Sequence, residues 1–315
     1  MDDSVIDVKQ VKTAILLLAH GAPNSVNDIP LYLKNIRGGT ESSPEVIQLI
    51  KDRYNAIGGS SPLLEITQAQ ASALQDYLNQ DNESFKVYVG MRNWSPYIKS
   101  AIEECLKDGT ERIITICLAP QYSKWSTERY LSSFNDALVK CSGTNIETRL
   151  ISSWADHPGL IDAFVERYNE AIDREKNNGK NEIHTIFTAH SIPAESLDYG
   201  DPYANEYEKT VQKIVDRVKP DNWHSAYQSQ GMIPIPWLGP TVEETLDKVA
   251  DAGGKNVLIM PVGFVCDHIE ILYDIDVDFK EYAQKKNLKL SRTESLNTSP
   301  TFIQALAEII WGHMI

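Results

Sequence analysis

The chain has 315 residues, of which 42% are hydrophobic and 23% charged, and its 30 basic against 44 acidic side chains give a formal net charge of −14. These values are typical of a folded protein with one large or two ordinary domains, and the negative charge argues against nucleic acid as a partner. No stretch approaches the roughly 18 apolar residues of a transmembrane helix, and the acidic start Met1-Asp2-Asp3-Ser4 lacks the basic region of a signal peptide. We therefore expect a cytoplasmic location, and a peripheral membrane contact is compatible with the sequence.

Apolar runs typical of strands alternate with helical patterns along nearly the whole chain. The expected strands cover residues 14–19, 85–90, 113–118, 146–151, 183–189, 225–228, 256–262 and 289–292. The expected helices cover residues 43–57, 63–78, 97–107, 127–140, 159–174, 205–218, 241–252, 267–285 and 301–312. Strands separated by helices indicate parallel β/α units whose sheets are covered on both faces.

The expected strands fall into two groups of four, separated by the polar stretch 173–182, which begins as helix and ends as linker. We predict an α/β fold of two similar domains, each with an open, four-stranded parallel sheet. The predicted boundaries are residues 1–172 for the N-terminal domain, 173–182 for the linker and 183–297 for the C-terminal domain. A last helical segment, 298–315, is expected to pack on the N-terminal domain.

Ligands of open α/β sheets bind at the carboxyl ends of the strands. The residues that follow the expected strands include aromatic, imidazole, guanidinium and hydroxyl side chains, namely His20, Arg92, Tyr122, Ser123, His190 and Trp237. Taken one by one, these residues are compatible with ordinary structural roles. Taken together, they fit a cleft for a large flat ligand with polar edges.

Several common kinds of site are not supported. The chain has no GxGxxG and no GxxxxGK[ST] motif, so a dinucleotide or ATP site is not indicated. Ser191 lacks the nucleophile-elbow pattern of hydrolases. The four cysteines show no CxxC spacing and do not cluster, which argues against a disulfide framework, a zinc ribbon and a four-cysteine iron–sulfur site.

The segment after the strand at 256–262 carries acids four residues apart, Glu270, Asp274 and Asp278. On one α-helix they would share a face, where like charges repel by a few tenths of a kcal/mol per pair, and a bound cation or a proton relay would offset this. A structural interpretation competes, because Asp267 followed by Glu270 also resembles an N-cap with a capping box. His190, at an equivalent strand end, shifts the interpretation toward metal binding or proton transfer, and Asp267 is still expected to cap the helix.

These features together resemble the ferrochelatases, which insert ferrous iron into a porphyrin. The matching segments run in family order at residues 58–63, 120–123, 189–193, 200–203, 227–229, 236–240, 264–273 and 294–297. The resemblance implies two Rossmann-like domains with a porphyrin cleft between them. It further implies a late step of heme biosynthesis, with protoporphyrin IX or coproporphyrin III as the porphyrin.

The resemblance also implies roles for individual residues. His190 and Glu270 would be the catalytic pair, and the metal would be handled by His190, Glu270, Asp274 and Asp278. The porphyrin would contact His20, Arg92, Tyr122, Ser123 and Trp237. Ferrous iron would be a substrate, with no cofactor required. The cysteine-bearing C-terminal extension of animal members is missing, so no iron–sulfur cluster is expected.

The chain departs from the family pattern at His20, where other branches have Tyr or Met, and at Tyr227, where Trp is common. Whether His20 ligates iron is therefore open at this stage. Two other functions are compatible with the same fold, a cobalt chelatase and a non-catalytic carrier of tetrapyrrole or metal. The sequence does not decide which of His190 and Glu270 binds metal and which accepts the proton, nor the oligomeric state.

Overall fold

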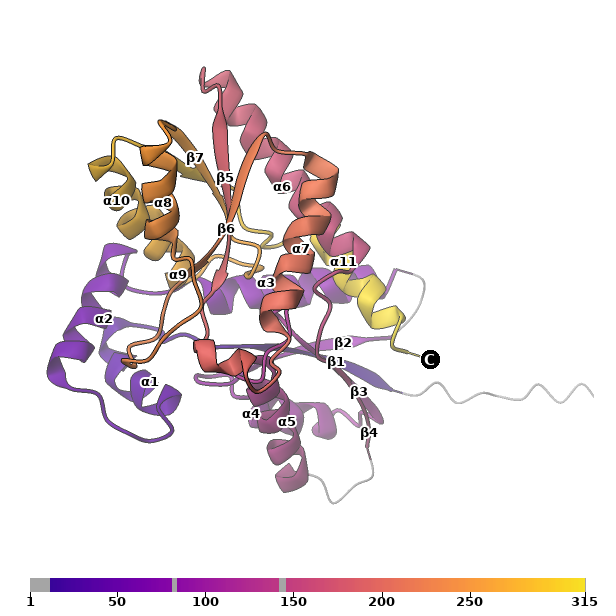
Figure 1. The fold of residues 1–315 in the computed structure, drawn as a ribbon. Helices are drawn as coiled ribbons and strands as arrows, with labels where there is room; N and C mark the ends of the chain where they lie inside the picture. The colour runs from indigo at the N-terminus through magenta and orange to yellow at the C-terminus, as the bar shows by residue number, and fades with distance from the viewer. Residues whose placement is uncertain (1–11, 81–83, 142–145, 315) are drawn as a thin grey trace, which may run out of the picture.

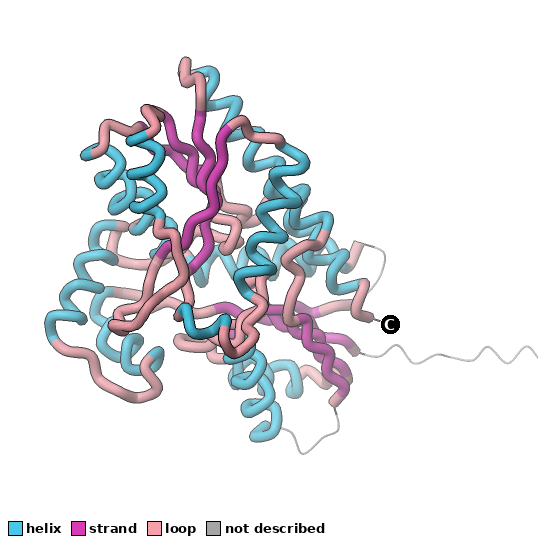
Figure 2. The backbone as a smooth tube through the Cα atoms, in the orientation of Figure 1, coloured by secondary structure: helices cyan, strands magenta, loops and turns pink. Residues whose placement is uncertain are grey.

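A computed structural model describes residues 12–80, 84–141 and 146–314 of the protein. The predicted domain limits at residues 1 and 315 lie outside these ranges. The described chain forms two sheets with helices around them (Figures 1 and 2).

The first half contains four strands and six α-helices within the described residues. In chain order they are β1 (Thr13–Ala19), α1 (Ile29–Ile36), α2 (Pro44–Ala56), α3 (Leu63–Leu78), β2 (Lys86–Met91), α4 (Ile98–Lys107), β3 (Arg112–Cys117), α5 (Thr127–Cys141), β4 (Glu147–Ile151) and α6 (Pro158–Asn177). The sequence predicted all of them except α1 and the short 3-10 helix η1 (Val26–Asp28) that precedes it. In α1 only Ile29 and Tyr32 are buried, so its hydrophobic pattern is weak.

The second half repeats the alternation. It contains β5 (Ile183–His190), the 3-10 helix η2 (Ala194–Leu197), α7 (Tyr203–Val218), β6 (Asn222–Gln228), α8 (Val242–Asp251), β7 (Asn256–Met260), α9 (Ile269–Leu272), the π-helix η3 (Asp274–Phe279), α10 (Lys280–Lys285), β8 (Lys289–Arg292) and α11 (Pro300–Trp311). One expected helix, 267–285, is therefore three consecutive segments in the structure. The other expected elements are present with ends shifted by a few residues.

Both sheets are parallel and have the same topology. The strand orders are β2-β1-β3-β4 and β6-β5-β7-β8, which confirms two four-stranded parallel sheets. In each sheet the second strand in chain order lies on one side of the first strand, and the third and fourth strands lie on the other side. The point where the direction reverses therefore lies between β1 and β3 in the first sheet, and between β5 and β7 in the second. Ligands of open α/β sheets bind at such points.

Three layers of apolar side chains cover the sheets. Alternate residues of β1 point to opposite faces, so that Ile15 and Leu17 belong to a central core while Leu16 and Leu18 pack under α4 and α5. The central core also includes Phe187 of β5 and Phe302 of α11, and it joins the two halves. A third cluster lies between the second sheet and α8, η3 and α10. Figure 1 shows α8 and α10 on one side of the second sheet and α6 and α7 on the other.

The helices α6 and α11 connect the halves. Helix α6 continues to Asn177, so the first part of the stretch 173–182 is helical and the rest is linker. Helix α11 packs against α6 and α3, both of the first half. Gly159 permits this contact, because a Cβ at that position would lie 2.9 Å from the Cβ of Ala305. In the described part of the chain, no helix is both long and apolar enough to cross a membrane.

Candidate active site

The carboxyl ends of β5 and β7 bring His190 and Glu270 together. After β7 the chain passes close over the end of β5, where the backbone N–H of Gly263 donates to the carbonyl of Thr188 at 3.1 Å. Only glycine fits there, since a Cβ on Gly263 would lie 2.7 Å from the Cβ of Ala189. The loop then reaches α9, and Glu270 Oε1 lies 3.6 Å from His190 Nε2. The predicted pair is therefore formed in the structure.

A second imidazole contacts the same carboxylate. His268 Nε2 lies 3.4 Å from Glu270 Oε2, so Glu270 lies between two histidines. The sequence analysis did not assign a role to His268, although it stands only two residues before Glu270. Its ring also packs on Phe264, with ring centroids 4.7 Å apart, which fixes its orientation.

Backbone carbonyls determine which ring nitrogen of each histidine faces the site. His190 Nδ1 bonds the carbonyl of Ser191, and His268 Nδ1 bonds the carbonyl of Cys266 at 3.1 Å. A carbonyl only accepts, so each Nδ1 carries the proton, and each Nε2 of a neutral ring presents a lone pair to Glu270. A lone pair and a carboxylate repel each other. A proton or a metal cation between them makes the two contacts attractive.

The charge state of Glu270 follows from these neighbours. Burial alone would raise its pKa, but the charges of His190, His268 and His20 in their protonated forms, and the hydrogen bond that His268 then donates, lower the pKa to about 2. The side chain of Glu270 is 32% exposed, so water still reaches the carboxylate although protein surrounds it. Glu270 is thus a carboxylate at neutral pH, positioned to attract a cation.

His20 follows β1 and lies in the first half. Its Nδ1 bonds the carbonyl of Gly21 at 3.0 Å, and the hydroxyl of Tyr32 lies 3.2 Å from the same nitrogen. Desolvation lowers the pKa of His20, although the residue as a whole is exposed, and the hydrogen bond to Gly21 and the charge of Glu270 partly oppose this. With Nδ1 directed to the backbone, Nε2 of His20 is the nitrogen available to a ligand.

The prediction that Asp267 caps the following helix is wrong. His268 occupies the N-cap position of α9 and makes no side-chain capping bond. The carboxylate of Asp267 instead accepts hydrogen bonds from Ser295 Oγ and Asn297 Nδ2, both at 2.8 Å, and lies 3.3 Å from Arg292. These partners come from the end of β8 and the loop after it, which are distant in sequence, and they outcompete the local capping interaction.

The expected row of acids on one α-helix is also wrong in its geometry. Glu270 belongs to α9, whereas Asp274 and Asp278 belong to the wider π-helix η3, so a spacing of four no longer places them in register. Asp274 is buried, accepts a hydrogen bond from Ser229, and lies 3.8 Å from Arg53 of α2. Asp278 is exposed.

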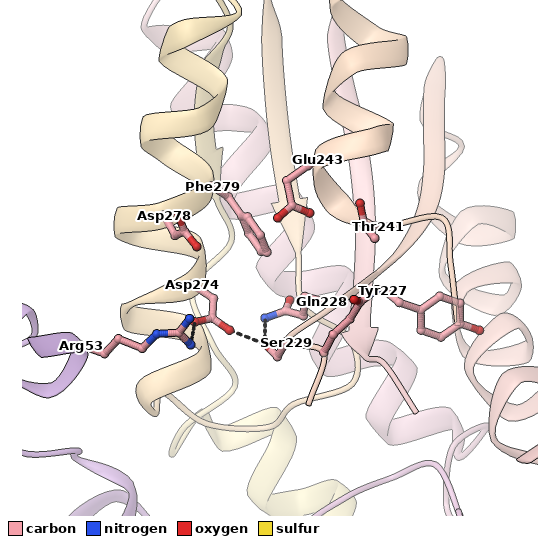
Figure 3. A pocket seen from close by; sticks show the side chains of 10 residues that line it. Arg53, Tyr227, Gln228, Ser229, Thr241, Glu243, Asp274, Asp278 and Phe279 are labelled. Carbon is pink, nitrogen blue, oxygen red and sulfur yellow. Dashed lines mark hydrogen bonds and ion pairs between the residues drawn. The ribbon is translucent and has the colours of Figure 1, made fainter. Parts of the chain in front are cut away.

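Asp274 and Asp278 line a cavity of about 320 Å³ (Figure 3). Figure 3 shows Arg53 reaching from the first half toward Asp274, with Ser229 on the other side of this carboxylate. Burial and the charge of Glu270 raise the pKa of Asp274 to about 6, against the opposing effects of Ser229 and Arg53. Glu243, which the sequence analysis did not select, adds a third carboxylate.

Gln228 lines this cavity and also contacts Glu270. Its side-chain amide donates to the backbone carbonyl of Glu270 at 2.9 Å, and its carbonyl accepts from Thr188 Oγ1 at 2.7 Å. In the described parts of the chain, no three His, Cys, Asp or Glu side chains converge as a ready-made metal site. Among the described residues, the carboxylates therefore do not form one chelating cage.

The other predicted ligand-binding residues differ in exposure. Arg92 is half-buried, its Nη1 donates to Asn93 Oδ1 at 3.2 Å, and its Nε is buried without an acceptor. Trp237 is half-buried, with its ring against Gly231 and its Nε1 donating to the carbonyl of Ile233 at 3.2 Å. The guanidinium of Arg92 and the indole N–H of Trp237 can each exchange their present contact for one with the polar edge of a ligand.

Tyr122 and Ser123 are already bonded within the protein. Tyr122 donates from its hydroxyl to Glu128 at 2.7 Å. Ser123 has no exposed surface, and its hydroxyl donates to Asp201 at 2.9 Å. A direct contact of Ser123 with a ligand would require the bond to Asp201 to open.

Comparison with known proteins finds one family over nearly the whole chain. Residues 12–314 match the family model of ferrochelatase. A protein of Herpetosiphon aurantiacus named ferrochelatase is 37% identical over 302 residues, covering 96% of this chain and 99% of that protein. A protein of Bacillus subtilis named coproporphyrin III ferrochelatase is 35% identical over 302 residues, covering 95% of this chain and 97% of that protein.

Solved structures show the same fold at low identity. SirB from Bacillus subtilis with Fe³⁺ has a TM-score of 0.59 at 12% identity and covers 96% of both chains. CbiX, described as the terminal enzyme of siroheme biosynthesis in denitrifying bacteria, has a TM-score of 0.54 at 12% identity and covers 96% of this chain and 100% of that one. These similarities support two Rossmann-like domains and say nothing about substrate.

Proposed function

The chain belongs to the ferrochelatase family, and from that premise we propose that it inserts ferrous iron into a porphyrin at the His190–Glu270 pair. One observation carries the assignment of these residues, namely that the Glu270 carboxylate lies between two imidazoles whose Nε2 atoms face it. The arrangement combines a negative charge that attracts a metal cation with bases that accept protons near neutral pH.

The reaction exchanges one ferrous ion for the two protons on the pyrrole nitrogens, and no electron is transferred. Two protons must therefore leave the ring, and two imidazoles flank Glu270 to receive them. We assign His190 Nε2 as the first acceptor and Glu270 as the group that stabilises the resulting imidazolium. His268 is the second imidazole, and its contact with Glu270 gives the proton a route away from the ring.

The metal has a separate approach in this proposal. Gln228 lines the cavity that holds Asp274 and Asp278, and it also donates to the backbone carbonyl of Glu270. Carboxylate oxygens suit a hard divalent ion, whereas imidazole nitrogens suit Fe²⁺ once it has lost water. We therefore assign Asp278, Asp274 and Glu270 as successive positions of the incoming ion.

The porphyrin is proposed to lie between the halves, with His20 on the opposite face from His190. Arg92 supplies a half-buried guanidinium group and Trp237 an aromatic ring, which suit a carboxylate edge and a flat ring. Bending of the ring in the cleft would expose its nitrogen lone pairs to iron, at the expense of strain that edge contacts offset.

We propose that no resident cofactor takes part. Iron is consumed as a substrate, and the exchange of a metal for protons is balanced without a redox group. Burial raises the pKa of the Cys105, Cys117 and Cys266 thiols to about 12 each, so these side chains are poor candidates for thiolate ligands.

An anaerobic assay that follows porphyrin absorbance tests the proposal. Protoporphyrin IX and coproporphyrin III are each offered with Fe²⁺, Co²⁺ and Zn²⁺, because the relatives carry both ferrochelatase names. We expect iron insertion into at least one of the two porphyrins. Preference for cobalt would favour a cobalt chelatase, and porphyrin binding without insertion of any metal would favour a carrier.

The variant His190→Ala tests the assigned pair. We expect loss of insertion with porphyrin binding largely retained, because the ring would lose its proton acceptor but not its edge contacts. Binding is followed by fluorescence quenching and insertion by absorbance. His157, the N-cap of α6, provides a control, since His157→Ala should leave kcat unchanged. Wild-type insertion by His190→Ala would refute the assignment.

A further inference from the structure

Arg292 contacts both ends of the segment that carries Glu270. It is the last residue of β8, the edge strand of the second sheet, and pairs in register with Ile259 of β7. Its side chain is only 14% exposed. The two carboxylates that it contacts are Asp267 and Asp276, which stand before His268 and after Glu270 in the chain.

The contact with Asp276 is bidentate. Arg292 Nε donates to Oδ1 at 2.8 Å and Nη2 donates to Oδ2 at 3.0 Å. A planar guanidinium that meets both oxygens of a carboxylate fixes orientation as well as distance. Asp276 lies in the π-helix η3, so Arg292 fixes the downstream end of the segment to the sheet.

The contact with Asp267 fixes the upstream end. Nη2 lies 3.3 Å from Asp267 Oδ1, and Ser295 and Asn297 donate to the same carboxylate. The backbone N–H of Asp267 donates to Asn297 Oδ1 at 2.9 Å, so the residue is held through side chain and main chain together. His268 follows directly.

Glu270 depends on these anchors for its position. Its carboxylate contacts His190 and His268, the groups that the proposed reaction uses, so these contacts must change during turnover. The backbone carbonyl of Glu270 accepts from Gln228 at 2.9 Å. The two ends of the segment and the backbone carbonyl of Glu270 are thus held by groups that the proposed reaction does not use.

We propose that Arg292 is a positioning residue for metal insertion, which holds Glu270 and His268 against His190 through Asp276 and Asp267. The inference rests on the proposed function. It predicts that loss of Arg292 impairs turnover without impairing porphyrin binding, because Arg292 acts only on the segment with Glu270.

The test compares Arg292→Gln with Arg292→Lys and with a matched control. Displacing a catalytic group by about 1 Å costs on the order of 100-fold in rate. We expect kcat for iron insertion to fall about 10- to 100-fold in Arg292→Gln, with the porphyrin Kd within about twofold. Arg292→Lys should be intermediate, since Lys keeps the charge but lacks the bidentate geometry.

The control is Arg112→Gln in the other half. Arg112 is also a strand residue with a low exposure of 21%, and its Nε donates to Glu147 at 2.9 Å, far from Glu270 in the fold. We expect this variant to lower the melting temperature and to leave kcat per folded molecule unchanged. An equal loss of kcat in both variants would make the role of Arg292 one of general stability and overturn the inference.

A double-mutant cycle with Asp276→Asn locates the effect. If Arg292 acts through Asp276, the double variant should be no more impaired than Arg292→Gln alone. Additive losses would overturn this route. Should Arg292→Gln fail to fold, Asp276→Asn and Ser295→Ala test the two anchors separately, and wild-type kcat in both would refute the positioning role.

Glu270→Gln distinguishes this inference from the proposed function. If Glu270→Gln turns over like the wild type, the proposed function at this pair fails. If Glu270→Gln is inactive while Arg292→Gln turns over normally, only the positioning role fails.

Discussion

The two halves of this protein have the same strand order but use the equivalent loop in different ways. The loop after β3 carries Gln121, Tyr122 and Ser123, and the loop after β7 leads to His268 and Glu270. In the first loop the polar groups bond to the second half. Gln121 Nε2 donates to Thr210 Oγ1 at 3.1 Å and to the carbonyl of Val262 at 3.2 Å, and Ser123 donates to Asp201.

In the second loop the polar groups face each other. Glu270 meets His190 and His268, and although burial raises its pKa, the charges of the neighbouring histidines and the hydrogen bond from His268 lower it to about 2. The comparison shows that a shared topology supplies two equivalent positions, while the side chains decide that one joins the halves and the other gathers the groups of the proposed active site.

Replacing Glu270 should have the largest effect on activity among the variants that compare the two halves. Glu270→Gln removes the charge between the imidazoles, and we expect kcat to fall about 10³-fold, within the range for loss of an acid–base group. His20→Ala, at the equivalent strand end of the first half, should lower kcat by about tenfold or less, because His20 does not contact Glu270. Steady-state iron insertion measures both. Equal losses would mean that the first half also carries chemistry.

Ser123→Ala should affect stability rather than activity. It leaves the buried Asp201 carboxylate without one donor, which costs about 1.5 to 3 kcal/mol of unfolding free energy. We expect the KM for porphyrin to change less than twofold. Urea unfolding measures the unfolding free energy, and the initial rate at increasing porphyrin concentration gives the KM. Ser133→Ala, at a surface serine of α5, is the control and should change stability by less than about 0.5 kcal/mol.

A large rise in the KM for porphyrin in Ser123→Ala, without loss of stability, would contradict this role. It would assign the serine to the ligand, as the sequence analysis first proposed.

Asp274→Asn should produce the smallest and most pH-dependent effect. The pKa of Asp274 in the folded protein, about 6, exceeds the ordinary value of 3.8. Between these pH values the folded state binds more protons than the unfolded state, so this group lowers stability as the pH rises through that window. We compare the unfolding free energy of Asp274→Asn with that of the wild type at each pH. The variant should gain about 1 to 3 kcal/mol relative to the wild type when the pH is raised from 4 to 7.5.

Urea unfolding at both pH values checks this expectation, with Asp278→Asn as the exposed control. A difference that does not vary with pH, or that shifts in the opposite direction, would contradict the raised pKa. The control should show little dependence, because Asp278 is exposed to solvent.

The sequence determined the architecture because the fold depends on local and repeated signals. The run at 14–19 is apolar throughout, which is typical of a strand covered on both faces, and the intervening helices have apolar stripes. The same signals placed His190 and Glu270 at strand ends, where open α/β sheets bind ligands. The short α1, with only Ile29 and Tyr32 buried, carried too weak a signal to be predicted.

Only the tertiary structure decided how the segment around Glu270 is held. Local rules made Asp267 a helix cap and placed Glu270, Asp274 and Asp278 in one row. Arg292, Ser295 and Asn297, which are distant in sequence, bond to the carboxylate of Asp267 in place of the helix N-terminus. Arg292 also bonds to Asp276 in the π-helix η3. Periodicity cannot encode such contacts, because their energy comes from residues that meet only after the sheet has formed.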